Sequence, residues 1–72
     1  MDEVKIGGIY RHYKNKDYKV LAVATHTETL EKMVVYQALY GERGIWVRPL
    51  QMFVEKVLVD GKEIPRFALK GE

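Results

Sequence analysis

Hydrophobic residues concentrate in two runs near the middle of the chain, and shorter alternating segments flank them. The first run covers Tyr18–Ala24 and the second covers Met33–Tyr40, with the polar link Thr25–Lys32 between them. The first run is apolar on both faces and is interrupted only by Lys19. That pattern is typical of a central strand in a closed or doubly covered sheet.

The segment before the first run alternates in the way that a strand does. Ile9–Tyr13 places Arg11 and Tyr13 on one face and His12 on the other, and it is rich in aromatic and β-branched residues. The next four residues, Lys14–Asp17, are of the types that tolerate turn geometry. We therefore predict a hairpin between this strand and the first apolar run.

The segment from the polar link onward fits two interpretations. Thr25 and Glu28 match a helix capping box, and the apolar positions that follow fit a helical stripe. Val34–Tyr36, however, is a β-branched and aromatic cluster that loses side-chain freedom in a helix. We predict a loop through Leu30, with at most one helical turn, and then a strand over Lys32–Leu39. A helix starting within residues 29–40 is the alternative.

The second half of the chain is a series of short elements separated by Gly and Pro. Two closely spaced glycines supply the positive φ that a tight turn needs, and Pro cannot donate to a strand ladder. In order, we predict a turn at Tyr40–Gly44, a strand at Ile45–Arg48, one helical turn at Pro49–Phe53, strands at Val54–Val59 and Lys62–Ile64 joined by a turn at Asp60-Gly61, and a loose tail over Ala68–Glu72.

Together these elements predict one small, mainly β domain over residues 1–72, with an ordered part at about 6–67. Five to six short strands with Gly-rich turns and one helical turn near residues 49–53 favour an SH3-like barrel or a rolled antiparallel sheet. Closing the sheet also removes exposed strand edges.

Composition excludes several classes of protein. The 72 residues include no Cys, so disulfides and thiolate zinc sites are ruled out. Two His among the carboxylates make a poor ligand set, and we predict no metal and no cofactor. The net charge of +2 does not by itself demand an anionic partner. No apolar run is long enough for a membrane span and Met1–Lys5 lacks a signal pattern, so we expect a cytoplasmic protein with no membrane partner.

Several blocks of this sequence resemble a known family. The blocks are Tyr10–Lys14, Tyr18–Ala24, Glu28-Thr29, Val34–Gly41, Trp46–Pro49 and Met52-Phe53. They are similar to a family of short bacterial proteins catalogued only as domain of unknown function 1653, and the resemblance extends from Gly8 to Phe67. It implies a small, mainly β bacterial domain that stands alone or is attached to other domains, and it implies no activity.

One group of polar and aromatic residues, spread over the predicted strands, combines guanidinium groups, phenols and imidazoles. Arg binds phosphate through two parallel hydrogen bonds and aromatic rings stack on bases, so this mixture suits an anionic or planar ligand. The alternative is that the tyrosines pack their rings and the arginines are simply solvated. The group comprises Arg11, His12, Tyr13, His26, Glu28, Tyr36, Arg48 and Arg66.

The predicted first hairpin offers a second candidate, because Arg11–Lys19 carries basic residues interleaved with tyrosines. Basic charge with exposed rings is how single-strand binders work without sequence preference. Lys is equally common in turns and as a guard on edge strands, so the hairpin has an ordinary structural reading as well.

A third candidate is catalytic. His26 and Glu28, with His12 nearby in space, could support acid–base chemistry or hold a divalent metal. The chain contains no Ser or Cys nucleophile and no phosphate-cradling glycine loop. The simpler reading is that Glu28 caps a local turn and His26 is a loop residue, so an enzyme is the least favoured class.

Trp46 also has two readings. It can fill the core, since no other side chain buries more apolar area, or it can line an exposed groove. It shares a strand face with Arg48, which could flank whatever Trp46 covers.

The sequence thus favours a non-enzymatic binding module whose ligand is a nucleic acid or a nucleotide-like molecule. The alternative is a protein–protein interaction or homo-oligomerisation module that uses an exposed apolar face. The candidate ligand-binding residues are Arg11, His12, Tyr13, His26, Glu28, Tyr36, Trp46 and Arg48.

Overall fold

Seven short strands and one helical turn make up the structure, a computed structural model that describes residues 4–71. The elements in chain order are β1 (Ile9–His12), β2 (Lys16–Thr25), β3 (Lys32–Ala38), β4 (Ile45–Pro49), α1 (Leu50–Val54), β5 (Lys56–Val59), β6 (Lys62–Pro65) and β7 (Phe67–Gly71).

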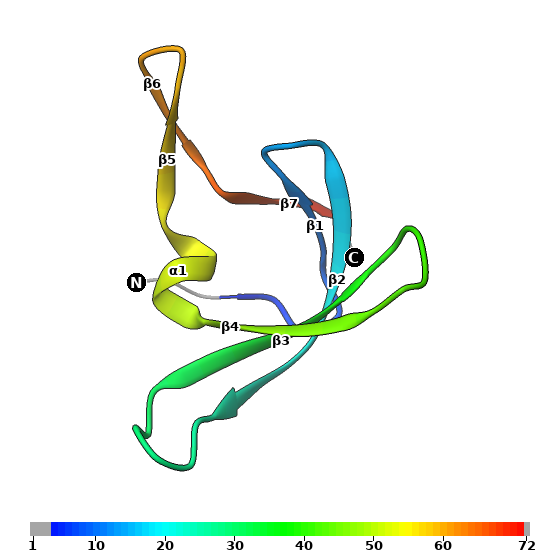
Figure 1. The fold of residues 1–72 in the computed structure, drawn as a ribbon. Coiled ribbons are helices and arrows are strands. Elements are labelled where there is room, and N and C mark those ends of the chain that lie inside the picture. The colour runs from blue at the N-terminus through cyan, green and yellow to red at the C-terminus, as the bar shows by residue number, and fades with distance from the viewer. Residues whose placement is uncertain (1–3, 72) are drawn as a thin grey trace.

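Five of the strands form one antiparallel sheet in the order β4-β3-β2-β1-β7. The remaining pair, β5 and β6, forms a separate hairpin that projects from the body of the molecule (Figure 1). The structure confirms the prediction of a mainly β domain with one helical turn. Its open sheet is compatible with the rolled form and not with a closed barrel, because in the described chain β4 and β7 are edge strands. The structure has seven strands, more than the five to six expected. It also confirms a strand rather than a helix over Lys32–Ala38.

A bulge in β2 explains why the first apolar run lacks alternation. The register between β2 and β3 shifts between Val20 and Ala22. Before the bulge Val20 lies opposite Tyr36, and after it Val23 lies opposite Val34, so the inward positions change from even to odd. A bulge also bends its strand and increases the local twist. Even-numbered residues point inward before the bulge and odd-numbered residues after it. The run can therefore be apolar at nearly every position although the sheet has a single inner face.

The core is built from aromatic and β-branched side chains on the inner face of the sheet. Its buried members are Tyr10, Val20, Val34, Tyr36, Phe53 and Phe67. Phe53 of α1 stacks on Phe67 of β7 with ring centroids 4.1 Å apart and planes only 4° from parallel. This pair fastens the helical turn to the sheet. Trp46 is 59% exposed. The interpretation in which Trp46 fills the core is therefore wrong.

The predicted loose tail from Ala68 was wrong, because residues 67–71 form β7. This strand pairs antiparallel with β1, with Phe67 opposite His12 and Leu69 opposite Tyr10. The edge of β1 away from β2 would otherwise carry unpaired backbone groups, and β7 satisfies them. Phe67 in turn places a ring in the core.

In the part of the chain that the structure describes, α1 is the one helix, and it has five residues. Within the described range 4–71, no helix has the length and the apolar character needed to cross a bilayer.

Candidate functional site

The inner face of the sheet carries a group of rings that continues from the core to the surface. His12 packs edge-on against Phe67 with centroids 4.9 Å apart, and Tyr36 packs edge-on against Phe67 at 5.6 Å. Tyr18 lies 5.3 Å from Tyr36 in the same manner. We call this region the aromatic–arginine face. The buried rings of Tyr36 and Phe67 form its base, and its other members are His12, Tyr18, Tyr40, Trp46, Arg48 and Arg66.

Arg48 occupies the middle of the aromatic–arginine face. Its Nε donates a hydrogen bond of 3.3 Å to Tyr36 Oη, and its guanidinium carbon lies 5.7 Å from the ring centroid of Phe67. Among the side chains that the structure describes, no carboxylate forms a salt bridge with Arg48. Its positive charge is therefore balanced only by rings and a phenol.

His12 reports the positive potential of this surface. Burial lowers its pKa most, and the charges of Arg48, Arg66 and Lys14 lower it further. Burial disfavours the charged imidazole, and each nearby cation adds to that effect. The cations come from β4, from the segment between β6 and β7, and from the β1–β2 turn. The face is thus prepared for an anion.

Arg66 connects this surface to the projecting hairpin. Its Nη2 donates to Glu55 Oε1 at 2.7 Å, and its backbone N–H donates to the carbonyl of Glu55 at 3.0 Å. Its carbonyl accepts from the N–H of Tyr13 at 2.9 Å. Arg66 Nε is buried and has no hydrogen-bond partner in the described part of the chain. These bonds fix the guanidinium at the base of the hairpin.

Two tyrosines form the rim on the other side. Tyr18 Oη and Tyr40 Oη lie 2.5 Å apart, and their rings meet edge-on at 5.5 Å. Burial, and then the bond to Tyr40, raises the pKa of Tyr18 to about 12. Lys16 Nζ lies 4.8 Å from the centroid of the Tyr40 ring, which is a cation–π geometry. Tyr40 itself is 41% exposed.

Four of the eight predicted site residues come together on the aromatic–arginine face. His12 belongs to β1, Tyr36 to β3, and Trp46 and Arg48 to β4. The strand register places them on the inner face of the sheet. Trp46 lies opposite Tyr36 and Arg48 lies opposite the buried Val34 in the β3–β4 pair, and His12 lies opposite the buried Phe67 in the β1–β7 pair.

Tyr13 lies beside this face but not on the strand face expected for it. Strand β1 ends at His12, and Tyr13 begins the turn. The Tyr13 ring lies 4.6 Å from the His12 ring, and Lys14 Nζ is 5.8 Å from its centroid.

Arg11 lies on the opposite, outer face of the sheet. It pairs with Asp17 in the β1–β2 register, and its Nε contacts Asp17 Oδ1 at 2.9 Å. Lys70 Nζ reaches the same carboxylate at 2.8 Å. The expected association of Arg11 with the other candidates is therefore absent, since adjacent residues of a strand point to opposite faces.

His26 and Glu28 lie in the loop between β2 and β3. His26 Nδ1 accepts hydrogen bonds from the backbone N–H groups of Glu28, at 3.1 Å, and Thr29, at 3.3 Å. The imidazole thus stabilises the turn. Among residues 4–71, no group of three or more His, Asp or Glu is placed to hold a metal ion.

The sequence-based reading missed Tyr18, Tyr40 and Phe67 as members of this surface. Tyr36, Ala38 and Tyr40 are spaced by two residues, so Tyr40 continues the inward-facing series past the end of β3. This spacing was visible in the sequence. Phe67 had no such signal, because its position depends on the pairing of β7 with β1.

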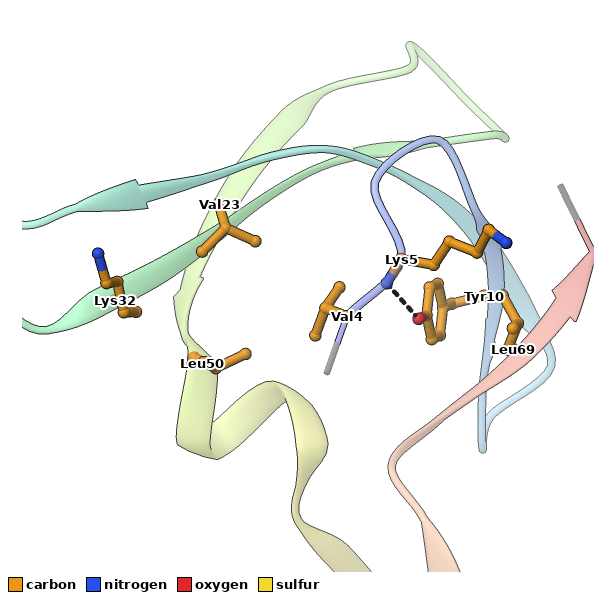
Figure 2. Close-up of a pocket in the computed structure, with 7 residues that line it drawn as sticks. All are labelled: Val4, Lys5, Tyr10, Val23, Lys32, Leu50 and Leu69. Atoms are coloured by element: carbon orange, nitrogen blue, oxygen red, sulfur yellow. Dashed lines mark hydrogen bonds between the residues drawn. The ribbon is translucent and has the colours of Figure 1, made fainter. Parts of the chain in front are cut away.

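An open hollow of about 720 Å³ lies near the start of the described chain, away from the aromatic–arginine face. Val4, Val23 and Leu50 line it, with Tyr10 and Leu69 at one side (Figure 2). The hydroxyl of Tyr10 accepts a bond of 2.9 Å from the backbone N–H of Lys5. Lys5 and Lys32 complete the lining, whose other members are apolar or aromatic.

A family model described as a protein of unknown function, DUF1653, matches residues 8–69 of the chain. This chain belongs to the DUF1653 family. A crystal structure of a DUF1653 protein from Bordetella bronchiseptica is similar to this domain, with 37% sequence identity, a TM-score of 0.85, and coverage of 99% of this chain and 94% of the other. No curated protein matches the chain significantly.

The DUF1653 match confirms the resemblance noted from the sequence. It spans the aromatic–arginine face, since that surface begins at His12 and ends at Phe67. Membership in this family does not itself define an activity.

Proposed function

We propose that this DUF1653 domain is a binding module for anionic, planar ligands, namely nucleotides, either free or as units of a single-stranded nucleic acid. The observation that carries the proposal is the setting of Arg48. Its guanidinium lies against Tyr36 and Phe67 and has no salt-bridge partner in residues 4–71. A guanidinium in that position can donate two parallel hydrogen bonds to a phosphate.

The electrostatics of the surface support an anion. Arg48, Arg66 and Lys14 all act on His12, so their potentials add at one place. Of these three cations, Arg66 is paired with a carboxylate in the described chain, that of Glu55. A phosphate placed near Arg48 meets several cations and little negative charge, which favours binding most strongly at low ionic strength.

Exposed rings beside these cations support a planar ligand. Trp46 is 59% exposed, and its indole lies along β4 over Gly44, where a Cβ would sit 3.3 Å from Trp46 Nε1. The outward side of the indole is available for stacking. A base stacked on an aromatic side chain contributes about 1–3 kcal/mol, and every base can stack, so we expect weak sequence preference.

The alternative expected from the sequence, a protein-interaction module, has separate support in the exposed edge of β4. An acid–base enzyme gains no support from His26, whose Nδ1 is engaged in the loop. A cytoplasmic site of action, expected from the sequence, is part of the proposal.

Binding of a fluorescently labelled single-stranded oligonucleotide, followed by anisotropy, tests the proposal. An oligonucleotide of about ten nucleotides falls within the range that one small β domain covers. We expect saturable binding at low salt that weakens as salt is raised. Arg48→Gln is expected to weaken the affinity for the oligonucleotide by about tenfold. It should also reduce the slope of log affinity against log salt concentration by about 1, the equivalent of one phosphate contact.

Arg11→Gln is the matched control, because it removes the same charge from the outer face of the sheet. We expect its affinity to stay within about twofold of wild type, as for a surface change remote from the ligand. Titration with a mononucleotide and with pyrophosphate, read from Trp46 emission, separates a free nucleotide from a nucleic acid and from a simple anion. Equal losses in the two Arg variants, or no binding of any of these probes at low salt, would contradict the proposal.

A further inference from the structure

The outer edge of β4 is the most exposed apolar segment of the sheet. In the described chain, β4 pairs with β3 on one side and with no strand on the other. Ile45, Trp46 and Val47 are exposed by 60%, 59% and 60%, respectively. A strand edge with exposed apolar side chains is a template for pairing with another chain.

The backbone groups available at this edge follow from the ladder. In an antiparallel pair, successive residues turn their N–H and C=O alternately toward one neighbour and the other. The N–H of Ala38 donates to the carbonyl of Gly44 at 2.9 Å, so Gly44 faces β3. The residues of β4 that face away from β3 are therefore Ile45, Val47 and Pro49. Pro49 has no N–H to leave unpaired there, as is usual for Pro at a strand edge.

The two edges of the sheet differ in protection. At the other edge, β7 carries Lys70, a residue type that discourages edge pairing, and Lys70 is ion-paired to Asp17. Strand β4 contains no Lys, Asp or Glu between Ile45 and Pro49. Only the terminal Pro49 limits how far a partner strand could extend.

We propose that two copies of this chain pair antiparallel through β4, about a two-fold axis at Val47. Val47 donates its N–H to the carbonyl of the partner's Val47, and Ile45 donates to the carbonyl of the partner's Pro49. The two-fold axis repeats both bonds. This register overlaps the whole of β4 with its copy. The return bond from Pro49 to the carbonyl of Ile45 is not made, because Pro has no N–H.

The side chains of β4 are complementary to themselves in this register, which is why a second copy fits the edge. Trp46 and Arg48 lie on the same face with Val47 between them. An axis at Val47 therefore places each Trp46 opposite the partner's Arg48, so that an indole and not a second cation lies across from each arginine. No like charges meet, and on the outer face Ile45 meets the partner's Pro49. The isologous contact closes after two copies.

This pairing does not rest on the nucleotide proposal. It does have a consequence for the same surface, because Trp46 and Arg48 belong to the aromatic–arginine face. The faces of the two copies become adjacent, and the partner's Arg48 lies beside Trp46.

Light scattering without any ligand tests the pairing over a roughly hundredfold range of concentration, because mass action shifts a weak dimer across such a range. We expect wild type to approach the mass of two chains. Val47→Lys places like charges at the axis and is expected to give one chain throughout. Leu58→Lys makes the same change at a residue that is 74% exposed on the β5–β6 hairpin, and it should behave as wild type.

Disulfide trapping tests the register, since the chain has no natural Cys to interfere. Val47→Cys should form a covalent dimer under mild oxidation several-fold faster than Leu58→Cys, because directly opposed strand residues lie within disulfide reach. A wild-type mass of one chain at every concentration overturns the proposal. Equal rates of disulfide formation in the two Cys variants also overturn it, because the disulfides would then come from random collisions between molecules. In that case the partner of the β4 edge would be an extended segment of a different protein.

Discussion

Asp17 has an unusual environment for a surface carboxylate, since it receives two cations from different strands. Arg11 Nε lies 2.9 Å from Oδ1, and Lys70 Nζ lies 2.8 Å from Oδ2. Hydrogen bonds to Arg11 and then to Lys70 lower the pKa of Asp17 to about 2, from an ordinary value of 3.8. The ionised carboxylate thereby helps to hold β7 beside the first hairpin.

A pH dependence of stability follows from this lowered pKa. Because the folded state holds the proton more weakly than the unfolded chain, the contribution of Asp17 is complete above pH 3.8 and is lost as the pH falls toward about 2. Asp17→Asn is expected to lower the urea midpoint at neutral pH and to flatten its fall in acid. Glu42→Gln, which removes an equal charge from an exposed site, should keep the wild-type profile. Parallel acid profiles for wild type and Asp17→Asn would contradict this role.

Arg11 and Arg48 show why single residues of the site were only partly predictable. Both are arginines within short strands, and nothing local in the sequence separates them. The structure gives Arg11 a carboxylate on the outer face and gives Arg48 the rings of the inner face. That difference depends on which strand lies opposite each residue, and pairing across a sheet is not a local property.

The hairpin of β5 and β6 illustrates an element whose geometry was predictable. Asp60-Gly61 was expected to be a tight turn, and both residues have positive φ, 53° and 79°. Positive φ at both central positions is the type I′ turn that matches the twist of two antiparallel strands. The signal here is local, because two adjacent residues determine the turn.

Gly61→Ala should destabilise the domain by about 1 kcal/mol, since a Cβ is disfavoured at positive φ. The space around Gly61 is open within 4 Å, so the cost is one of backbone conformation alone. Gly71→Ala is the matched control, because its surroundings are equally open and its φ is outside the positive region. Urea denaturation checks both. Similar midpoints for the two variants would show that the turn tolerates Ala.

Strand β7 illustrates the opposite case. The segment Ala68–Glu72 was expected to be a loose tail, because it is short and lies at the end of the given sequence. Its partner, β1, lies at the other end of the sequence, so pairing is specified by long-range register rather than by local propensity. The bulge in β2 is similar, since an extra residue is recognised only against the neighbouring strand.

The molecule as a whole depends on a small aromatic core. With principal extents of 37 × 27 × 19 Å, it has few fully buried side chains, and Phe53 is the largest of them. Phe53 contacts Tyr10, Tyr36 and Phe67, which come from three different strands of the sheet. The sequence indicated an apolar core but assigned no special position to Phe53, because its neighbours meet only when the sheet is rolled.

Phe53→Ala is expected to cost about 3–5 kcal/mol, the usual range for removing a buried Phe. Small domains have a thin stability margin, so this variant should be largely unfolded. Phe53→Leu should stay folded, with a loss below about 1.5 kcal/mol. Met52→Ala, next to it but 50% exposed, should change stability by less than about 0.5 kcal/mol. Circular dichroism with urea titration checks all three, and a folded Phe53→Ala protein would mean that the core does not depend on this ring.

The position of β7 also bears on how the protein is made. Since β7 pairs with β1 and carries Phe67 into the core, the nascent chain lacks both a sheet edge and a central ring until that last strand has left the ribosome. Pairing between such distant segments also slows folding. During synthesis β1 therefore presents unpaired backbone to solvent, and this is the interval in which a chaperone would encounter the chain.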